Sequence, residues 1–218
     1  MTPRVKICCI ASVEEAWTAI QYGASAVGLV SEMPSGPGPT PEALIARIAA
    51  GVPPSVSSFL LTSKQDTRSI IAQHSRCGTS TIQIVDRLES GSYQDLREAM
   101  PGIALVQVIH VTGEEAVDEA LAVESQVDAI LLDSGNQSLA IKELGGTGRA
   151  HDWRISRKIR ESIGKPLFLA GGLKADNVAE AIAEVRPFGI DVCSGVRTEG
   201  SLDERKLGAF FEKIRSMH

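Results

Sequence analysis

The sequence predicts an α/β fold, a single-domain (β/α)8 TIM barrel that spans residues 1–218, and three observations support this prediction. Short, β-branched apolar runs alternate along the chain with longer amphipathic runs. Apolar runs of this kind are typical of parallel strands buried on both faces, which need helices as crossovers. Eight such units occur without a linker or a low-complexity tract between them, and eight units of this kind close into a barrel.

The apolar runs give the expected strands, which are Val5–Ile10, Ala26–Val30, Val56–Leu61, Thr81–Val85, Ile103–Ile109, Ala129–Leu132, Pro166–Ala170 and Gly189–Cys193. Between them the apolar residues take helical spacing, as in 178–185 and 207–214. Ser12, followed three residues later by Glu15, predicts the N-cap of a helix over 14–22. The alternative is an open, doubly wound sheet. It would need a glycine fingerprint after the first strand, and Cys8-Cys9-Ile10-Ala11 has none.

Composition and charge narrow the function classes. The net charge is −5 and no run of lysine or arginine occurs, so neither nucleic acid nor an anionic membrane is an expected partner. The N-terminus has no long apolar run and no segment is long enough to span a bilayer, so we expect a cytoplasmic protein. The four cysteines form no CxxC pair and no zinc-type spacing, so no metal site and no structural disulfide is expected.

Two side chains at strand ends could carry acid–base chemistry, because active sites of such barrels lie at the carboxyl ends of the strands. Asp133 ends an apolar run, where its raised pKa would suit a general acid; the alternative is a cap of the following loop. Cys8 lies near the end of the first strand with Lys6 on the same face, which suits a thiolate base or nucleophile. Strand alternation sends Cys8 and Cys9 to opposite sides, and position alone does not choose between them.

Three glycine-rich loops predict a binding site for a small phosphorylated substrate. Glycines let backbone N–H groups approach an anion closely, and barrels often bind phosphate after strands seven and eight. Each loop alone could be an ordinary turn. The loops are Gly145-Gly146-Thr147-Gly148 after the sixth strand, Gly171-Gly172 after the seventh, and Ser194-Gly195 after the eighth.

Motifs along nearly the whole chain resemble those of the phosphoribosylanthranilate isomerase family of tryptophan biosynthesis. The matching stretches are Val5-Lys6-Ile7-Cys8, 27–30, Leu131-Leu132-Asp133-Ser134, 145–148 with Asp152-Trp153, 169–173 with Asp176-Asn177-Val178, and 189–196. The resemblance implies an Amadori rearrangement of an aminated ribose phosphate, with Asp133 as the acid and Cys8 as the base. It implies no metal or organic cofactor, because the substrate nitrogen accepts the electrons. Substrate and phosphate contacts are expected from Lys6, Gly146, Thr147, Gly148, Gly171, Gly172, Ser194 and Gly195.

The chain departs from the family pattern at one end of the expected pocket. Cys9 replaces the usual glycine, Cys193 replaces a serine, and Ser35-Gly36-Pro37 replaces a Ser-Pro-Arg whose arginine faces the anthranilate carboxylate. Arg197, which replaces a glutamate, is a candidate substitute for that arginine. Three alternatives therefore stand: a divergent isomerase, a paralogue acting on another phosphorylated substrate, and a non-catalytic binder. The presence of both the acid and the base argues against the binder. The sequence is compatible with two oligomeric states, a monomer and a homodimer.

Overall fold

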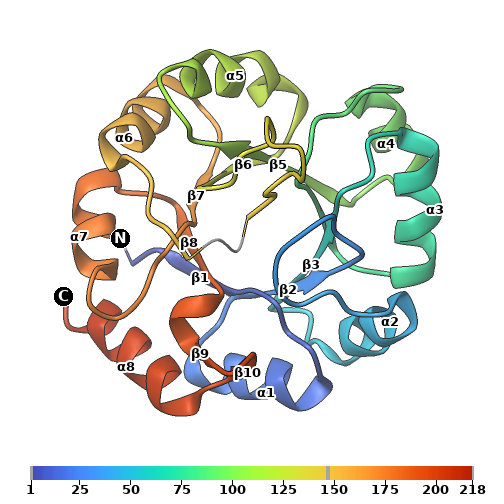
Figure 1. Cartoon of the computed structure of the whole chain (residues 1–218). Helices are drawn as coiled ribbons and strands as arrows, with labels where there is room; N and C mark the ends of the chain where they lie inside the picture. The colour runs from blue at the N-terminus through green and yellow to red at the C-terminus, as the bar shows by residue number, and fades with distance from the viewer. Residues whose placement is uncertain (1, 146–147, 218) are drawn as a thin grey trace.

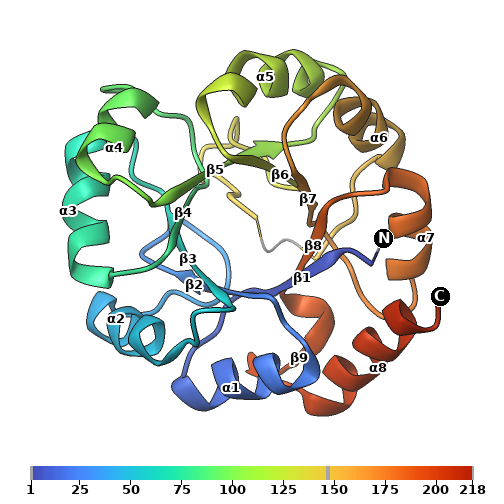
Figure 2. The ribbon, with the colours of Figure 1, turned by 180° about the vertical axis from the view of Figure 1, so that it is seen from behind.

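The computed structural model describes residues 2–145 and 148–217, and these form a closed barrel of parallel strands surrounded by helices (Figure 1). The strands follow one another in chain order from β1 to β8, and β8 pairs with β1 to close the ring. Figure 2 shows the same ring from the opposite end. The predicted barrel is therefore confirmed. No helix in the described part of the chain is long and apolar enough to cross a membrane.

The strands of the barrel are β1 Arg4–Ile7, β2 Ala26–Val30, β3 Ser57–Thr62, β4 Thr81–Ile84, β5 Ala104–His110, β6 Ala129–Asp133, β7 Leu167–Leu169 and β8 Gly189–Val192. The helices around it are α1 Val13–Tyr22, α2 Glu42–Gly51, α3 Thr67–Cys77, α4 Tyr93–Ala99, α5 Glu115–Val123, α6 Trp153–Ser162, α7 Val178–Val185 and α8 Glu204–Arg215. Two short 3-10 helices, η1 Glu124–Gln126 and η2 Ser194–Val196, and a small ribbon of β9 Arg197–Thr198 and β10 Ser201–Leu202 complete the described elements.

The first strand is shorter than the sequence predicts. The predicted strand runs to Ile10, whereas β1 ends at Ile7. Cys9 has a backbone φ of 61°, in the left-handed region that an extended strand does not use. The extended conformation therefore stops just before the two cysteines, although Cys8 N still donates to Val192 O at 2.8 Å. The other predicted strands match the observed ones within one or two residues at each end.

The inside of the barrel is a packed core whose shape positions the candidate site. Alternate residues of the strands point inward, as expected for a pleated strand. Phe59 of β3 and Phe168 of β7 meet edge to face, with ring centroids 6.0 Å apart. The Lys6 ammonium lies 5.3 Å from the centroid of the Phe59 ring. A charged side chain is thus held inside the barrel directly above its aromatic layer.

The α1 N-cap agrees with the sequence, but the capping glutamate has other partners. Ser12 Oγ accepts a hydrogen bond from Glu15 N at 3.1 Å, as predicted. The Glu15 carboxylate accepts from the backbone N–H groups of Ala11 and Leu202 and pairs with Arg197. Glu15 therefore ties the start of α1 to the segment that follows β8.

Candidate active site

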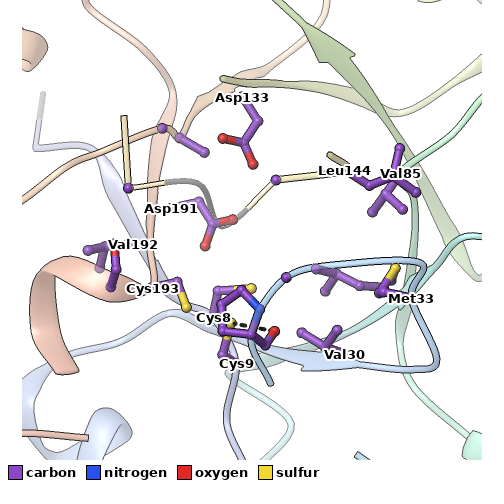
Figure 3. Close-up of a pocket in the computed structure, with 18 of the residues that line it drawn as sticks. Cys8, Cys9, Val30, Met33, Val85, Asp133, Leu144, Asp191, Val192 and Cys193 are labelled. Atoms are coloured by element: carbon purple, nitrogen blue, oxygen red, sulfur yellow. Dashed lines mark hydrogen bonds between the residues drawn. The ribbon is translucent and has the colours of Figure 1, made fainter. Parts of the chain in front are cut away.

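A cavity opens at the carboxyl ends of the strands. Figure 3 shows apolar side chains on one side of it and the cysteines and aspartates on the other. The apolar side includes Val30, Met33, Val85 and Leu144. The other side includes Cys8, Cys9, Cys193, Asp133 and Asp191, together with glycines of three loops. The cavity therefore combines an apolar wall with titratable groups and exposed backbone.

Cys8 lies beside a buried ion pair. Lys6 Nζ donates to Asp191 Oδ2 at 2.7 Å, and both side chains are buried. Asp191 also lines the cavity, and its Oδ1 has no hydrogen-bond partner among the described residues. A hydrogen bond from Cys9 lowers the pKa of Cys8, and the Lys6 ammonium lowers it further against the opposing effect of burial. This environment favours the Cys8 thiolate, as a base requires.

Gly28 of β2 makes the room that this arrangement needs. A Cβ at Gly28 would lie 2.8 Å from Cys8 Sγ and 3.0 Å from Lys6 Nζ. Both distances are too short for an unstrained contact, so only glycine lets the thiol and the ammonium share this part of the barrel. Sequence reasoning placed Gly28 in a family motif without giving it a role.

Both adjacent cysteines line the cavity, so the prediction that only one of them faces the interior is wrong. Alternation holds only within an extended strand, and the strand has ended at Ile7. The left-handed Cys9 turns the chain so that both sulfurs face the same cavity (Figure 3). Hydrogen bonds with Cys193 and Cys8, together with burial, raise the pKa of the Cys9 thiol. Cys9 therefore stays protonated, and its Sγ donates to Pro37 O at 3.7 Å (Figure 3).

Asp133 ends β6 and lines the opposite side of the same cavity. Its Oδ1 accepts a hydrogen bond from Ser134 N at 2.7 Å. Burial of the carboxyl group raises its pKa, the nearby Asp191 adds to this effect, and Ser134, His110 and Lys6 oppose it. The backbone of Gly145 passes so close that a Cβ there would lie 2.4 Å from Asp133 Oδ2. The sixth loop thus closes over an aspartate whose environment favours the protonated form.

The three glycine loops meet at one side of the cavity. Gly148, Gly171, Gly172 and Ser194 all line it, and a Cβ at Gly148 would lie 3.6 Å from Ser194 Oγ. Gly171 and Gly172 have φ values of 83° and 63°, which turn the chain back on itself. No described residue accepts a hydrogen bond from the backbone N–H of Gly171, Gly172, Ser194 or Gly195. These donors are available to an anion. The predicted Gly146 and Thr147 lie outside the described residues.

Three predicted site residues that the structure describes, Lys6, Gly195 and Arg197, are not among the residues that line the cavity. Arg197 is buried at 8% exposure. Its guanidinium donates to Glu15 at 2.8 Å, to Cys9 O at 2.5 Å and to Gly200 O at 2.7 Å. These bonds occupy it beneath the cysteine turn. We therefore do not include it among the residues proposed to contact substrate.

Comparison with known proteins gives a consistent match over the whole barrel. A family model described as N-(5'phosphoribosyl)anthranilate (PRA) isomerase matches residues 5–213. The N-(5'-phosphoribosyl)anthranilate isomerase 2 of Methanosarcina mazei is 35% identical, over 98% of this chain and 94% of its own. The phosphoribosyl anthranilate isomerase of Thermotoga maritima superimposes with a TM-score of 0.82 at 28% identity, covering 98% of this chain and 99% of its own. Another such isomerase, in complex with reduced 1-(o-carboxyphenylamino)-1-deoxyribulose 5-phosphate, superimposes with a TM-score of 0.79 at 26% identity, with the same coverage.

Proposed function

The chain belongs to the N-(5'-phosphoribosyl)anthranilate isomerase family, and we propose that it catalyses the Amadori rearrangement of that substrate with Asp133 as general acid and Cys8 as general base. The observation that carries this proposal is the placement of the two groups. An aspartate whose environment favours the protonated form and a cysteine whose environment favours the thiolate line one cavity. Two titratable groups with pKa values shifted in opposite directions are what acid–base chemistry at one substrate requires.

The first step opens the furanose ring. Asp133 donates its proton to the ring oxygen, the bond from that oxygen to C1′ breaks, and the substrate nitrogen supplies the electron pair that forms a C1′–N double bond. The raised pKa of Asp133 supports this role, because a carboxylic acid can donate only if it is protonated near neutral pH. Gly145, whose backbone covers the carboxyl group, would help to keep water away from it.

The second step moves the C2′ proton. The Cys8 thiolate removes it, and the electron pair flows into the C1′–N double bond to give an enolamine, which becomes the ketone by proton transfer to C1′. The substrate nitrogen accepts the electrons, so the rearrangement itself calls for no further cofactor. Lys6 holds positive charge beside the thiolate without donating to the substrate, because its ammonium is bound to Asp191.

The cavity suggests how the substrate lies. Its phosphate would accept hydrogen bonds from the backbone N–H groups at Gly171, Gly172, Ser194 and Gly195, and the ribose would lie between Asp133 and Cys8. The aromatic ring would then pack against Met33, Val85 and Leu144 on the apolar side. This orientation places C1′ and C2′ between the proposed acid and base.

The test is turnover of phosphoribosylanthranilate by wild type, Cys8→Ala and Asp133→Asn, with binding of the reduced product analogue measured alongside. General acid–base groups contribute about 10²–10⁴-fold each. Both variants should lose that much kcat while the dissociation constant changes by less than about tenfold, since each group acts mainly in the transition state. Wild-type levels of kcat in either variant would remove that residue from the mechanism.

One observation keeps a second candidate function open. No lysine, arginine or histidine occurs among the described residues that line the cavity, so no cation there faces the anthranilate carboxylate. Lys142 borders an adjoining depression that shares Met33 and Leu144 with the cavity, but its ammonium is bound to Asp86 at 2.6 Å. The same acid and base could therefore isomerise an aminated ribose phosphate without a carboxylate. Comparing kcat/KM for phosphoribosylanthranilate with that for phosphoribosylaniline decides this: a tenfold preference for phosphoribosylaniline would favour the second candidate.

A further inference from the structure

The mouth of the barrel holds three thiols in contact, of which the proposed chemistry uses one as its base. Cys9 is within hydrogen-bonding distance of both Cys8 and Cys193. Figure 3 shows the three sulfur atoms gathered at one side of the cavity. All three cysteines line the cavity and all three are free thiols. The fourth, Cys77, ends α3 and is not a lining residue. We propose that Cys9 and Cys193 form a reversible disulfide when the protein meets a hydroperoxide, making this cluster a site of oxidative modification.

The pairing follows from the backbone. β1 and β8 are neighbours with Ile7 opposite Val192, and the hydrogen bond from Cys8 N to Val192 O continues this pairing beyond β1. This register sets the backbone of Cys8 opposite that of Cys193, and neighbouring strands lie about 4.8 Å apart. The Cys8 sulfur, however, points toward Gly28 of β2, where an added Cβ would meet it at 2.8 Å, and it is Cys9 whose side chain interacts with Cys193. Cys8 and Cys9 are adjacent in the chain, with Cα atoms about 3.8 Å apart, below the range of about 4.4–6.8 Å that a disulfide spans. The contact between Cys9 and Cys193 is therefore the one that we expect to be oxidised.

The surroundings of the pair supply access and charge. Cys193 is only half-buried, and the cavity gives a small oxidant a path to its sulfur. Arg197 lies close enough to interact electrostatically with both Cys193 and Cys9. The buried Arg197, which does not line the cavity, thus places a positive charge beside the pair.

The chemistry balances with a hydroperoxide as the oxidant. The Cys193 thiolate attacks the terminal peroxide oxygen, the O–O bond breaks, and the products are a sulfenic acid and an alkoxide or hydroxide. The Cys9 sulfur then attacks the sulfenic sulfur, the S–O bond breaks, and the Cys9 proton leaves with the hydroxyl group as water. With hydrogen peroxide, two thiols and one peroxide give one disulfide and two waters, and a dithiol reductant reverses the change.

The disulfide would change the candidate site in two ways. It removes the S–H group of Cys9, so the proposed base loses the neighbour that most favours its thiolate. It also links the first and last strands of the barrel across 184 positions of the sequence, from Cys9 to Cys193. Closing so long a loop restricts the unfolded chain, and the midpoint of thermal unfolding should rise by roughly 10 °C.

The experiment maps the thiols of the full chain after reduction, desalting, exposure to hydrogen peroxide and alkylation. In wild type we expect a Cys193 cross-link by mass spectrometry, alkylated Cys77 and reversal by dithiothreitol. Because Cys8 and Cys9 share a tryptic peptide, variants assign the partner. Cys8→Ala should keep the cross-link, and Cys9→Gly and Cys193→Ser should each abolish it and the rise in Tm.

Three results would overturn the inference: three alkylated cavity thiols after peroxide, over-oxidation of Cys8 with Cys9 and Cys193 still alkylated, or a cross-link that persists in Cys9→Gly.

Turnover is a separate readout, with each variant compared with its own untreated sample. Wild-type turnover of phosphoribosylanthranilate should fall at least fivefold on oxidation and recover with dithiothreitol. Only this readout rests on the proposed function. If the untreated protein shows no turnover, the proposed function fails while the thiol map still decides the disulfide.

Discussion

Replacing Gly28 with alanine tests how closely the proposed base depends on the shape of the barrel. The new Cβ would lie 2.8 Å from Cys8 Sγ, where ordinary contacts begin at 3.4 Å, so the thiol or β2 must move by about 0.6 Å. A misplacement approaching 1 Å can cost about 10²-fold in rate. We therefore expect kcat to fall by about 10–100-fold. Over-packing of this kind also costs about 1–3 kcal/mol of stability, which lowers Tm by roughly 3–10 °C.

The assay is steady-state turnover of phosphoribosylanthranilate, with thermal unfolding followed by circular dichroism. Gly164→Ala is the matched control, because it is the same change at an exposed glycine where an added Cβ meets no atom within 4 Å. It should leave kcat and Tm close to those of wild type. A Gly28→Ala protein with wild-type kcat and Tm would show that the crowding around Cys8 and Lys6 is relieved without moving either group, and the reasoning would fail.

Three further changes probe other parts of the molecule. Arg197→Met should lower the free energy of unfolding by about 3 kcal/mol in urea titrations, because it leaves the Glu15 carboxylate without its cation. A tenfold rise in KM in the same variant would show that Arg197 does contact the substrate. Ser194→Asp should weaken phosphate binding at least tenfold by calorimetry, whereas Ser194→Ala should not, and equal binding by both would place the phosphate elsewhere. Burial lowers the pKa of His151 from 6.5 to about 4, so the unfolded chain binds more protons between these values and stability is lost as pH falls through them. Wild type should lose about 2 kcal/mol more than His151→Gln between pH 6.5 and 4, and identical pH profiles of unfolding would contradict this.

Periodicity was enough to predict the fold, because a strand buried on both faces must be continuously apolar whatever its neighbours are. The same reasoning located Asp133, since an aspartate directly after four buried residues has to emerge at the strand end. It failed at Cys9, whose left-handed backbone ends the strand and brings both sulfurs into one cavity. Cysteine carries no preference for that conformation that a sequence could reveal. The family resemblance did hold a signal, because a glycine at this position is what a positive φ favours.

The roles of Gly28, Gly145 and Asp191 could not be predicted from the sequence for a different reason. Each depends on a neighbour from another part of the chain: Gly28 on Cys8, Gly145 on Asp133, and Asp191 on Lys6. A motif shows that a glycine or an aspartate is present at a strand end, but not which side chain it meets across the barrel. Arg197 is a residue whose predicted role is not seen. A cation near a strand end was expected to line the cavity, but Arg197 instead donates hydrogen bonds to Cys9 O and to Glu15.

The two aspartates that line the cavity have the same side chain but different surroundings. Asp133 and Asp191 both line the cavity, and Asp191 helps to raise the pKa of Asp133. Asp191 is the one with a cation, because Lys6 approaches it at 2.7 Å from the adjacent strand and is itself fully buried. A buried ammonium without its partner would be strongly destabilising, so Asp191 is needed to hold Lys6 in place. The remaining carboxyl, Asp133, has no cation bound to it in the described residues and sits where burial favours the proton. The position of one lysine therefore pairs Asp191 and leaves Asp133 as the carboxyl that we propose as the acid, and the same lysine favours the thiolate of Cys8.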